Sequence, residues 1–181
     1  MTNLIVVMGV AGCGKSTIGA NLAEHLNSLS PNGAVFIEGD DLHSDGNRAK
    51  MASGVALTDL DREPWLAALV DKAASEAKTG REHVVLSCSA LKRRYRDQLR
   101  TAAQPQKDRM RFVYARVPVS TLSARLSTRK GHFMGASMLQ SQLDAFDEPV
   151  PAEEPDVVVV DNGNGELDIA LIAQLVVKER E

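Results

Sequence analysis

A glycine-rich segment near the start of the chain has the residue types and the spacing of a phosphate-binding loop. Residues 9–16 read GVAGCGKS and match the pattern G-x-x-x-x-G-K-[ST]. Glycines let backbone N–H groups turn inward around charged oxygens, and a following helix presents its positive N-terminal end to them. Lys15 would then reach the β- and γ-phosphates of a nucleotide, and the Ser16 hydroxyl would ligate Mg²⁺. The predicted phosphate-binding residues are Gly9, Val10, Ala11, Gly12, Cys13, Gly14, Lys15, Ser16 and Thr17.

A group of acidic residues follows the second apolar run of the chain, residues 34–37. Ligands of open α/β sheets bind beyond the carboxyl ends of the strands, so these acids are expected to face the phosphate-binding loop. A phosphoryl acceptor needs an oxygen that orients its hydroxyl group and takes the proton, and Asp40 is our candidate. Asp41 lies next to it, which leaves open which of the two carboxylates would act as the base. The alternative is that these acids belong to a solvated loop.

Two later segments carry clustered positive charge. Lys92 and Arg96 are four residues apart in a predicted helix, so they share a face and could hold an anionic group of a substrate. Arg125, Arg129 and His132 cluster around a glycine and could close over a transferring phosphate as a lid. The alternatives are a solvated basic helix for the first segment and a helix-end charge cluster for the second.

Short apolar runs alternate with helical patterns along the whole chain. Strands are predicted at residues 4–8, 34–37, 84–86, 110–117 and 157–160, and helices near residues 18–29, 58–80, 91–100, 120–129 and 166–177. This alternation is typical of an α/β fold with a largely parallel central sheet and helices on both faces. The glycine-rich loop would lie between the first strand and the first helix, which makes a chance match to its pattern rare. The proline-rich, acidic residues 147–155 are predicted to form a solvated surface loop.

Length and composition limit the classes of function that fit. The chain has 181 residues, a formal net charge of −3, 44% hydrophobic residues and 25% charged residues. These values fit one globular domain and argue against a strongly basic nucleic-acid-binding protein. Two widely separated cysteines, Cys13 and Cys88, argue against a disulfide framework and favour the cytoplasm. No apolar stretch reaches the roughly 20 residues that span a bilayer, and the first apolar run lacks the basic region of a signal peptide.

The absence of two GTPase motifs excludes some classes of nucleotide-binding protein. The guanine-reading pattern N/T-K-x-D and the γ-phosphate-sensing pattern D-x-x-G of GTPases do not occur in the sequence. A large ATPase motor would need a longer chain. These exclusions leave a small kinase whose acceptor is a metabolite or a nucleotide. A nucleotide-binding regulator that transfers nothing is the alternative from a different class.

Seven short blocks occur in a fixed order between residues 4 and 161. They are GVAGCGKST at 9–17, EGDDLH at 38–43, NRAKMASG at 47–54, DREPWL at 61–66, CSALK at 88–92, YRD at 95–97 and RKGHF at 129–133. In this combination the sequence resembles the bacterial gluconokinase family. The first block is shared by many kinases, whereas the blocks at 47–54, 61–66 and 129–133 are far more specific.

The resemblance implies a fold, a reaction and an assembly. The fold would be a P-loop NTPase domain of the adenylate-kinase type, with three α/β/α layers, a parallel sheet and a small lid. The reaction would transfer the γ-phosphate of ATP to the 6-hydroxyl of D-gluconate with the help of Mg²⁺, in sugar-acid catabolism. A homodimer is common in the family. We therefore expect one kinase domain over residues 1–181, with acceptor-binding residues in 40–66 and a lid at about 125–146; a shikimate- or nucleotide-type kinase is the nearest alternative.

The resemblance also implies roles for individual residues. The catalytic residues would be Lys15, Asp40 and Arg129. Arg125 would be a further lid cation at the nucleotide, and Glu38 would hold metal-bound water beside Ser16. The residues that would bind gluconate are Asp40, His43, Arg48, Lys50, Lys92, Arg96 and His132. The turn at 161–163 lies where such kinases bind adenine.

Overall fold

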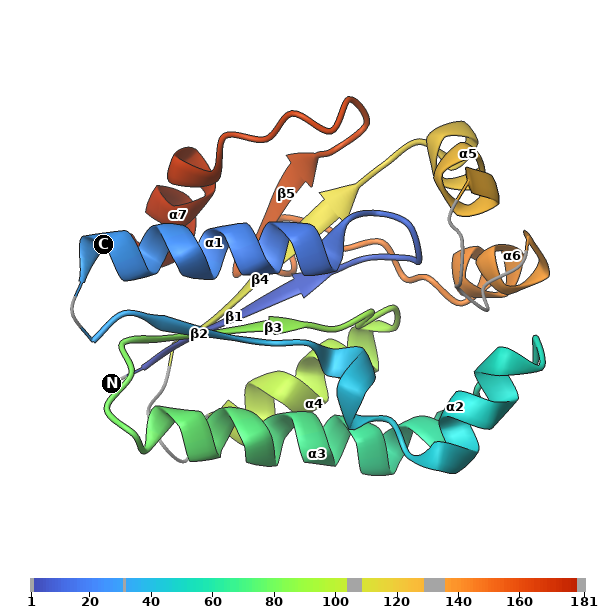
Figure 1. Ribbon diagram of the computed structural model, residues 1–181, viewed down its shortest axis with the longest axis horizontal. Helices are drawn as coiled ribbons and strands as arrows, with labels where there is room; N and C mark the ends of the chain where they lie inside the picture. Colours follow the sequence, from blue (N-terminus) through green and yellow to red (C-terminus); the bar gives the residue numbers. More distant parts are fainter. Residues whose placement is uncertain (1, 31, 104–108, 129–135, 179–181) are drawn as a thin grey trace.

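A parallel sheet lies at the centre of the protein (Figure 1). The computed structural model describes residues 2–30, 32–103, 109–128 and 136–178. Within these ranges the strands are β1 (Asn3–Met8), β2 (Ala34–Ile37), β3 (His83–Ser87), β4 (Arg109–Arg116) and β5 (Val157–Asp161). They pair in parallel in the order β2-β3-β1-β4-β5. Because parallel strands run in one direction, the loops that follow them meet at one edge of the sheet.

Helices cover both faces of the sheet and so give three layers. The helices that pack on the sheet are α1 (Lys15–Leu29), α3 (Asp59–Ala77), α4 (Arg93–Ala103) and α7 (Ile169–Val177). Figure 1 shows α1 and α7 on one face and α3 and α4 on the other. The remaining helices lie toward the carboxyl ends of the strands and are η1 (Gly39–Leu42), α2 (Asp45–Ala52), α5 (Val119–Thr128) and α6 (Ala136–Asp144). This arrangement confirms the predicted three-layer α/β/α fold.

The central strand β1 is apolar on both sides because helices cover both faces of the sheet. Ile5 and Val7 pack into one hydrophobic cluster, with residues of α1 and α7. Leu4, Val6 and Met8 pack into the other cluster, with residues of α3 and α4. Alternate side chains of a strand point to opposite faces, so a strand in this position needs a continuous apolar run. The glycine-rich loop is therefore anchored at its first residue to a buried strand.

Helix α3 begins at a capping box and ties the acidic loop to the core. Thr58 accepts a hydrogen bond from the backbone N–H of Asp61, and the Asp61 carboxylate accepts one from the backbone N–H of Thr58. This reciprocal pair fixes where the helix begins. Two turns later, the buried indole of Trp65 donates a hydrogen bond to the carbonyl oxygen of Gly39 at 2.7 Å. The loop after β2 is thereby held against α3.

The structure contains two helices, α2 and α6, that the hydrophobic pattern does not indicate. Helix α2 has a polar sequence, begins at the N-cap Ser44, and is held by a hydrogen bond from the side chain of Asn47 to the carbonyl of Asp61 at 2.7 Å. Helix α6 is nine residues long and buries Met138 and Leu139, and its partly buried Leu143 packs into the same cluster as Leu139, so its apolar stripe is very short. Helix α2 depends on a cap and a single side-chain contact, and α6 is too short for a long apolar stripe, so both helices leave little periodicity in the sequence.

The predicted solvated loop at residues 147–155 is wrong at Glu154. This carboxylate is 3% exposed and binds the guanidinium of Arg96 at 2.7 Å from Nε and 2.6 Å from Nη2. Arg100 donates to the same carboxylate at 2.8 Å. Burial raises the pKa of Glu154, but the hydrogen bonds from Arg96 and Arg100 outweigh burial, so the pKa is lowered overall. Because both arginines belong to α4, the loop is fixed to that helix.

Glu154→Gln is expected to lower the free energy of unfolding by about 3 kcal/mol, because it leaves the fully buried Arg96 without its counter-charge. Urea unfolding followed by the fluorescence of Trp65, the single tryptophan, measures this change. Glu153→Gln is the matched control, since Glu153 is exposed and pairs with the exposed Arg93, and its effect should be small. Equal losses in the two variants would contradict the structural role of Glu154.

Candidate functional site

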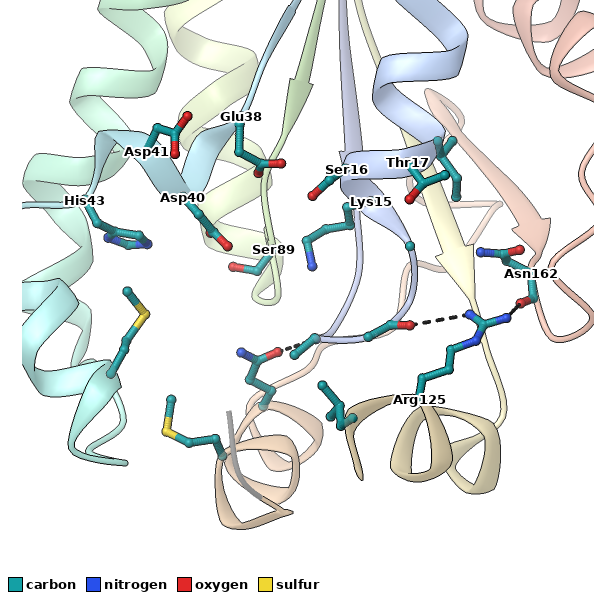
Figure 2. Close-up of a pocket in the computed structure, with 18 of the residues that line it drawn as sticks. Lys15, Ser16, Thr17, Glu38, Asp40, Asp41, His43, Ser89, Arg125 and Asn162 are labelled. Carbon is teal, nitrogen blue, oxygen red and sulfur yellow. Dashed lines mark hydrogen bonds between the residues drawn. The ribbon is translucent and has the colours of Figure 1, made fainter. Parts of the chain in front are cut away.

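A cavity of about 760 Å³ opens at the edge of the sheet where the strands end. Its walls come from the glycine-rich loop and α1, from η1, α2 and α3, and from α5, α6 and the loop after β5. Figure 2 shows, around this cavity, Lys15, Ser16, Thr17, Glu38, Asp40, Asp41, His43, Ser89, Arg125 and Asn162. The volume lies in the range of small-molecule sites. The cavity thus joins a phosphate-binding part to an acidic part.

The glycine-rich loop follows a backbone path that favours glycine. Gly9, Gly12 and Gly14 have φ angles of +138°, +81° and +96°. A Cβ atom on Gly14 would also lie 2.7 Å from the side-chain nitrogen of Asn162. Lys15 begins α1, and its Nζ donates a hydrogen bond to a carbonyl of the loop at 3.2 Å. The loop and the first turn of α1 line the cavity together, which is the arrangement that binds phosphate at a helix N-terminus.

Arg125 on α5 connects the glycine-rich loop to the loop after β5. Its guanidinium donates to the carbonyl oxygens of Gly12 at 3.4 Å and Asn162 at 2.7 Å. The side chain of Asn162 in turn donates to the carbonyl of Cys13 at 2.9 Å. Cys13 itself is fully buried and does not line the cavity. The structure places Arg125 at the cavity as predicted, and it singles out Asn162 within the predicted turn at 161–163.

Helix α6 contacts the glycine-rich loop through a side chain that the sequence analysis missed. Gln142 accepts a hydrogen bond from the backbone N–H of Ala11 at 2.7 Å, and both residues line the cavity. This bond ties α6 to the loop at a point between its glycines. No motif marks Gln142, because its helix is itself not indicated by the sequence. The predicted lid residues Arg129 and His132 lie outside the described residues.

The acidic loop after β2 packs closely against the end of β3. A Cβ atom on Gly39 would lie 2.0 Å from the carbonyl oxygen of Ser87. The N–H of Gly39 donates to the hydroxyl of Ser87 at 2.9 Å, and that hydroxyl donates to the Glu38 carboxylate. Glu38 and Asp40, which flank Gly39 in sequence, both line the cavity. The contacts of one glycine therefore fix two carboxylates of the site.

The two neighbouring carboxylates of η1 point in different directions. Figure 2 shows Asp40 pointing toward Ser89 and Lys15, whereas Asp41 points away from them. Both residues are exposed, and both line the cavity. The orientation favours Asp40 as the group that would meet an acceptor hydroxyl opposite the phosphate-binding loop.

His43 directly follows η1 and lies against Trp65. The two rings are stacked, with centroids 4.2 Å apart and an angle of 13° between their planes. Burial lowers the pKa of His43; Asp40 raises this pKa to a smaller extent, and Arg62 and Arg48 lower it further. His43 lines the cavity, and the lowered pKa favours its neutral ring near pH 7.

The other cations predicted to bind the substrate do not line the cavity and are paired with carboxylates. These pairs are Arg48–Asp45 at 2.6 Å, Lys50–Asp61 at 2.6 Å, Lys92–Asp59 at 2.9 Å and Arg96–Glu154 at 2.6 Å. The prediction for Arg96 is wrong: its side chain is fully buried, and it donates to the carbonyls of Ala90 and Leu91 at 3.1 and 3.3 Å. Lys92 precedes α4, so it does not share a helical face with Arg96. Arg96 supports the loop that carries Ser89.

Known proteins resemble the chain over most of its length. The family model described as "AAA domain" matches residues 4–149. The thermoresistant gluconokinase of Escherichia coli is 41% identical over 159 residues, which cover 88% of this chain and 84% of that protein. The chain belongs to the gluconokinase family.

Two further gluconokinases agree with this placement. The gluconokinase of Gluconobacter oxydans is 43% identical over 167 residues, which cover 92% of this chain and 86% of that protein. The crystal structure of a gluconokinase from Sinorhizobium meliloti is 43% identical, covers 96% of this chain and 89% of that chain, and superposes with a TM-score of 0.73. The resemblance seen in the seven sequence blocks is thereby confirmed, together with the P-loop kinase fold.

Gln142→Leu is expected to weaken ATP binding about fivefold to tenfold, because the Ala11 amide loses a hydrogen bond worth about 1 kcal/mol. Isothermal titration calorimetry measures the Kd. Gln140→Leu on the same helix is the control, since Gln140 is exposed and bonds to Asp144 at 2.7 Å. An unchanged Kd in the first variant, or the same loss in both, would show that the contact does not support the loop.

Proposed function

We propose that this protein transfers the γ-phosphate of ATP to the 6-hydroxyl of D-gluconate and releases 6-phosphogluconate and ADP. The observation that carries the proposal is the shared cavity, in which the phosphate-binding loop and the Asp40 carboxylate face a common space. The fold and the glycine-rich loop support ATP as the donor. Relatives named gluconokinases, which match most of the chain, support gluconate as the acceptor.

In this proposal each charged side chain has a separate role in phosphoryl transfer. Lys15 and the loop amides bind the phosphate oxygens and stabilise the charge that develops on them. Arg125 supports the loop from the nucleotide side. Asp40 orients the 6-hydroxyl and takes its proton as the oxygen bonds to the γ-phosphorus. The bond between that phosphorus and the β,γ-bridging oxygen breaks, and its electron pair leaves with ADP.

The residues at the cavity also fit a magnesium ion. Ser16 offers a hydroxyl and Glu38 a carboxylate, and both line the cavity. Nowhere in the described ranges do three or more His, Cys, Asp or Glu side chains form a group that could hold a metal. Mg²⁺ fits such a sparse set, since it uses one or two protein ligands together with phosphate oxygens and water. When bound, it would neutralise charge on the β- and γ-phosphates.

The proposal extends to the organisation of the whole protein. We propose one kinase domain over residues 1–181, with the acceptor region in 40–66, a lid at about 125–146 that includes Arg129 and His132, and a cytoplasmic homodimer. His43 belongs to the proposed acceptor region and Arg125 to the proposed lid. Both line the same cavity, which supports this assignment of the two regions. None of the helices in the described ranges is long and apolar enough to cross a membrane. Light scattering would test the dimer.

The substrate is tested by ADP release with MgATP and a panel of acceptors. Gluconate is expected to support turnover, whereas shikimate and nucleoside monophosphates should give little, because their shapes and charges differ from those of a linear sugar acid. Comparable turnover with either alternative would overturn the assignment of gluconate. A protein that binds ATP but transfers phosphate to none of them would be a nucleotide-binding regulator.

Asp40→Asn is expected to lower kcat about a hundredfold or more, because the amide cannot take the proton of the acceptor hydroxyl. ATP affinity should stay nearly unchanged, since Asp40 lies on the acceptor side of the cavity. Asp41→Asn is the matched control and should reduce kcat far less. If the loss were larger at Asp41, that residue would be the base in place of Asp40.

A further inference from the structure

The cavity has a cation on its acceptor side. Among the described lining residues, Lys15, Arg62 and Arg125 carry a permanent positive charge. Lys15 and Arg125 donate to carbonyl groups of the glycine-rich loop, on the nucleotide side. Arg62 lies in the first turns of α3, whose Trp65 stacks on His43. Arg62 therefore lies on the acceptor side of the cavity together with His43, and not on the side of the glycine-rich loop.

Within the described part of the chain, the guanidinium of Arg62 pairs with no carboxylate. Its Nε donates to the carbonyl oxygen of Leu57 at 3.4 Å, and the side chain is half-buried. The neighbouring Lys92 and Arg94 differ, because both pair with Asp59. A partly buried charge without a counter-charge is costly, and an anion that enters the cavity would relieve this cost.

A second polar group of the cavity wall, the ring of His43, has a nitrogen that forms no hydrogen bond with the described residues. This nitrogen is Nδ1, and His43 is 6% exposed. His43 stacks on Trp65, which lies three residues after Arg62 in α3, and both His43 and Arg62 line the cavity. Buried polar atoms in proteins nearly always have a hydrogen-bond partner. An unpaired nitrogen at the cavity wall therefore points to a polar ligand.

We infer that Arg62 binds the carboxylate of the acceptor and makes the enzyme specific for a sugar acid over a neutral polyol. This inference rests on the proposed function. Gluconate carries its carboxylate and its reacting hydroxyl at opposite ends of the molecule, so a site with Asp40 at the hydroxyl end needs a cation at the other. A guanidinium offers two parallel N–H donors that match the two carboxylate oxygens. His43 then offers its unpaired nitrogen to a hydroxyl group of the same ligand.

The test compares D-gluconate with D-gluconamide, which has the same hydroxyl groups and a neutral amide in place of the carboxylate. For Arg62→Met, kcat/KM with gluconate is expected to fall about 100-fold, mainly through KM, whereas kcat/KM with gluconamide should change by less than about threefold. Arg62→Lys keeps the charge without the paired donors and should recover part of the preference. Arg93→Met is the control, since Arg93 is exposed and pairs with Glu153, and it should change neither value.

Binding without turnover gives an independent measurement. Trp65 is the single tryptophan and stacks on His43, so its fluorescence can report gluconate binding in the absence of ATP. The Kd for gluconate should rise about 100-fold in Arg62→Met, while the thermal unfolding midpoint stays near that of the unaltered protein.

Two kinds of outcome would contradict the inference in different ways. Equal losses for gluconate and gluconamide, or no loss for either, would overturn the role of Arg62 and leave the proposed function in place. If the unaltered protein neither bound nor phosphorylated gluconate, both the inference and the proposed function would fail.

Discussion

The close approach of Gly39 to the carbonyl oxygen of Ser87 determines where the acceptor half of the site lies. A side chain at this position would overlap the backbone of β3, and the Trp65 indole holds the same glycine by a hydrogen bond to its carbonyl. Because β3 pairs with β1, the contact fixes the acidic loop relative to the loop that follows β1. Glu38 and Asp40 flank the glycine, so their distance from the phosphate-binding loop depends on this packing.

The sequence is most informative where one physical requirement determines the residues. The strands lie within one residue of their predicted ends, because each has an apolar centre where helices cover the sheet. The glycine-rich loop is equally clear, since its positive φ angles favour glycine. Helix α2 was missed because it is polar and depends on its cap, and α6 was missed because its nine residues carry only a very short apolar stripe. Gln142 was missed together with the helix that carries it.

Charged residues are harder to interpret, because the sequence does not show which charges neutralise one another. Arg96 looks available in the sequence, but its partner Glu154 comes from a loop far along the chain. Arg62 stands between Asp61 and Glu63 in the sequence, and it was not among the predicted site residues. In the structure Asp61 pairs with Lys50 and leaves the guanidinium of Arg62 to the cavity. Which cations remain without a carboxylate partner after tertiary pairing is known only from the folded chain.

The strand order gives the two halves of the site different local stability. β1 has a paired neighbour on each side, whereas β2 lies at the edge of the sheet and pairs with β3 alone. Backbone hydrogen bonds at a sheet edge open more readily than those at its centre, so amide hydrogens of β2 will exchange with solvent sooner than those of β1. Helix α2, which follows the edge strand and is largely exposed, therefore has fewer stabilising neighbours than the loop after β1, which begins at the centre of the sheet.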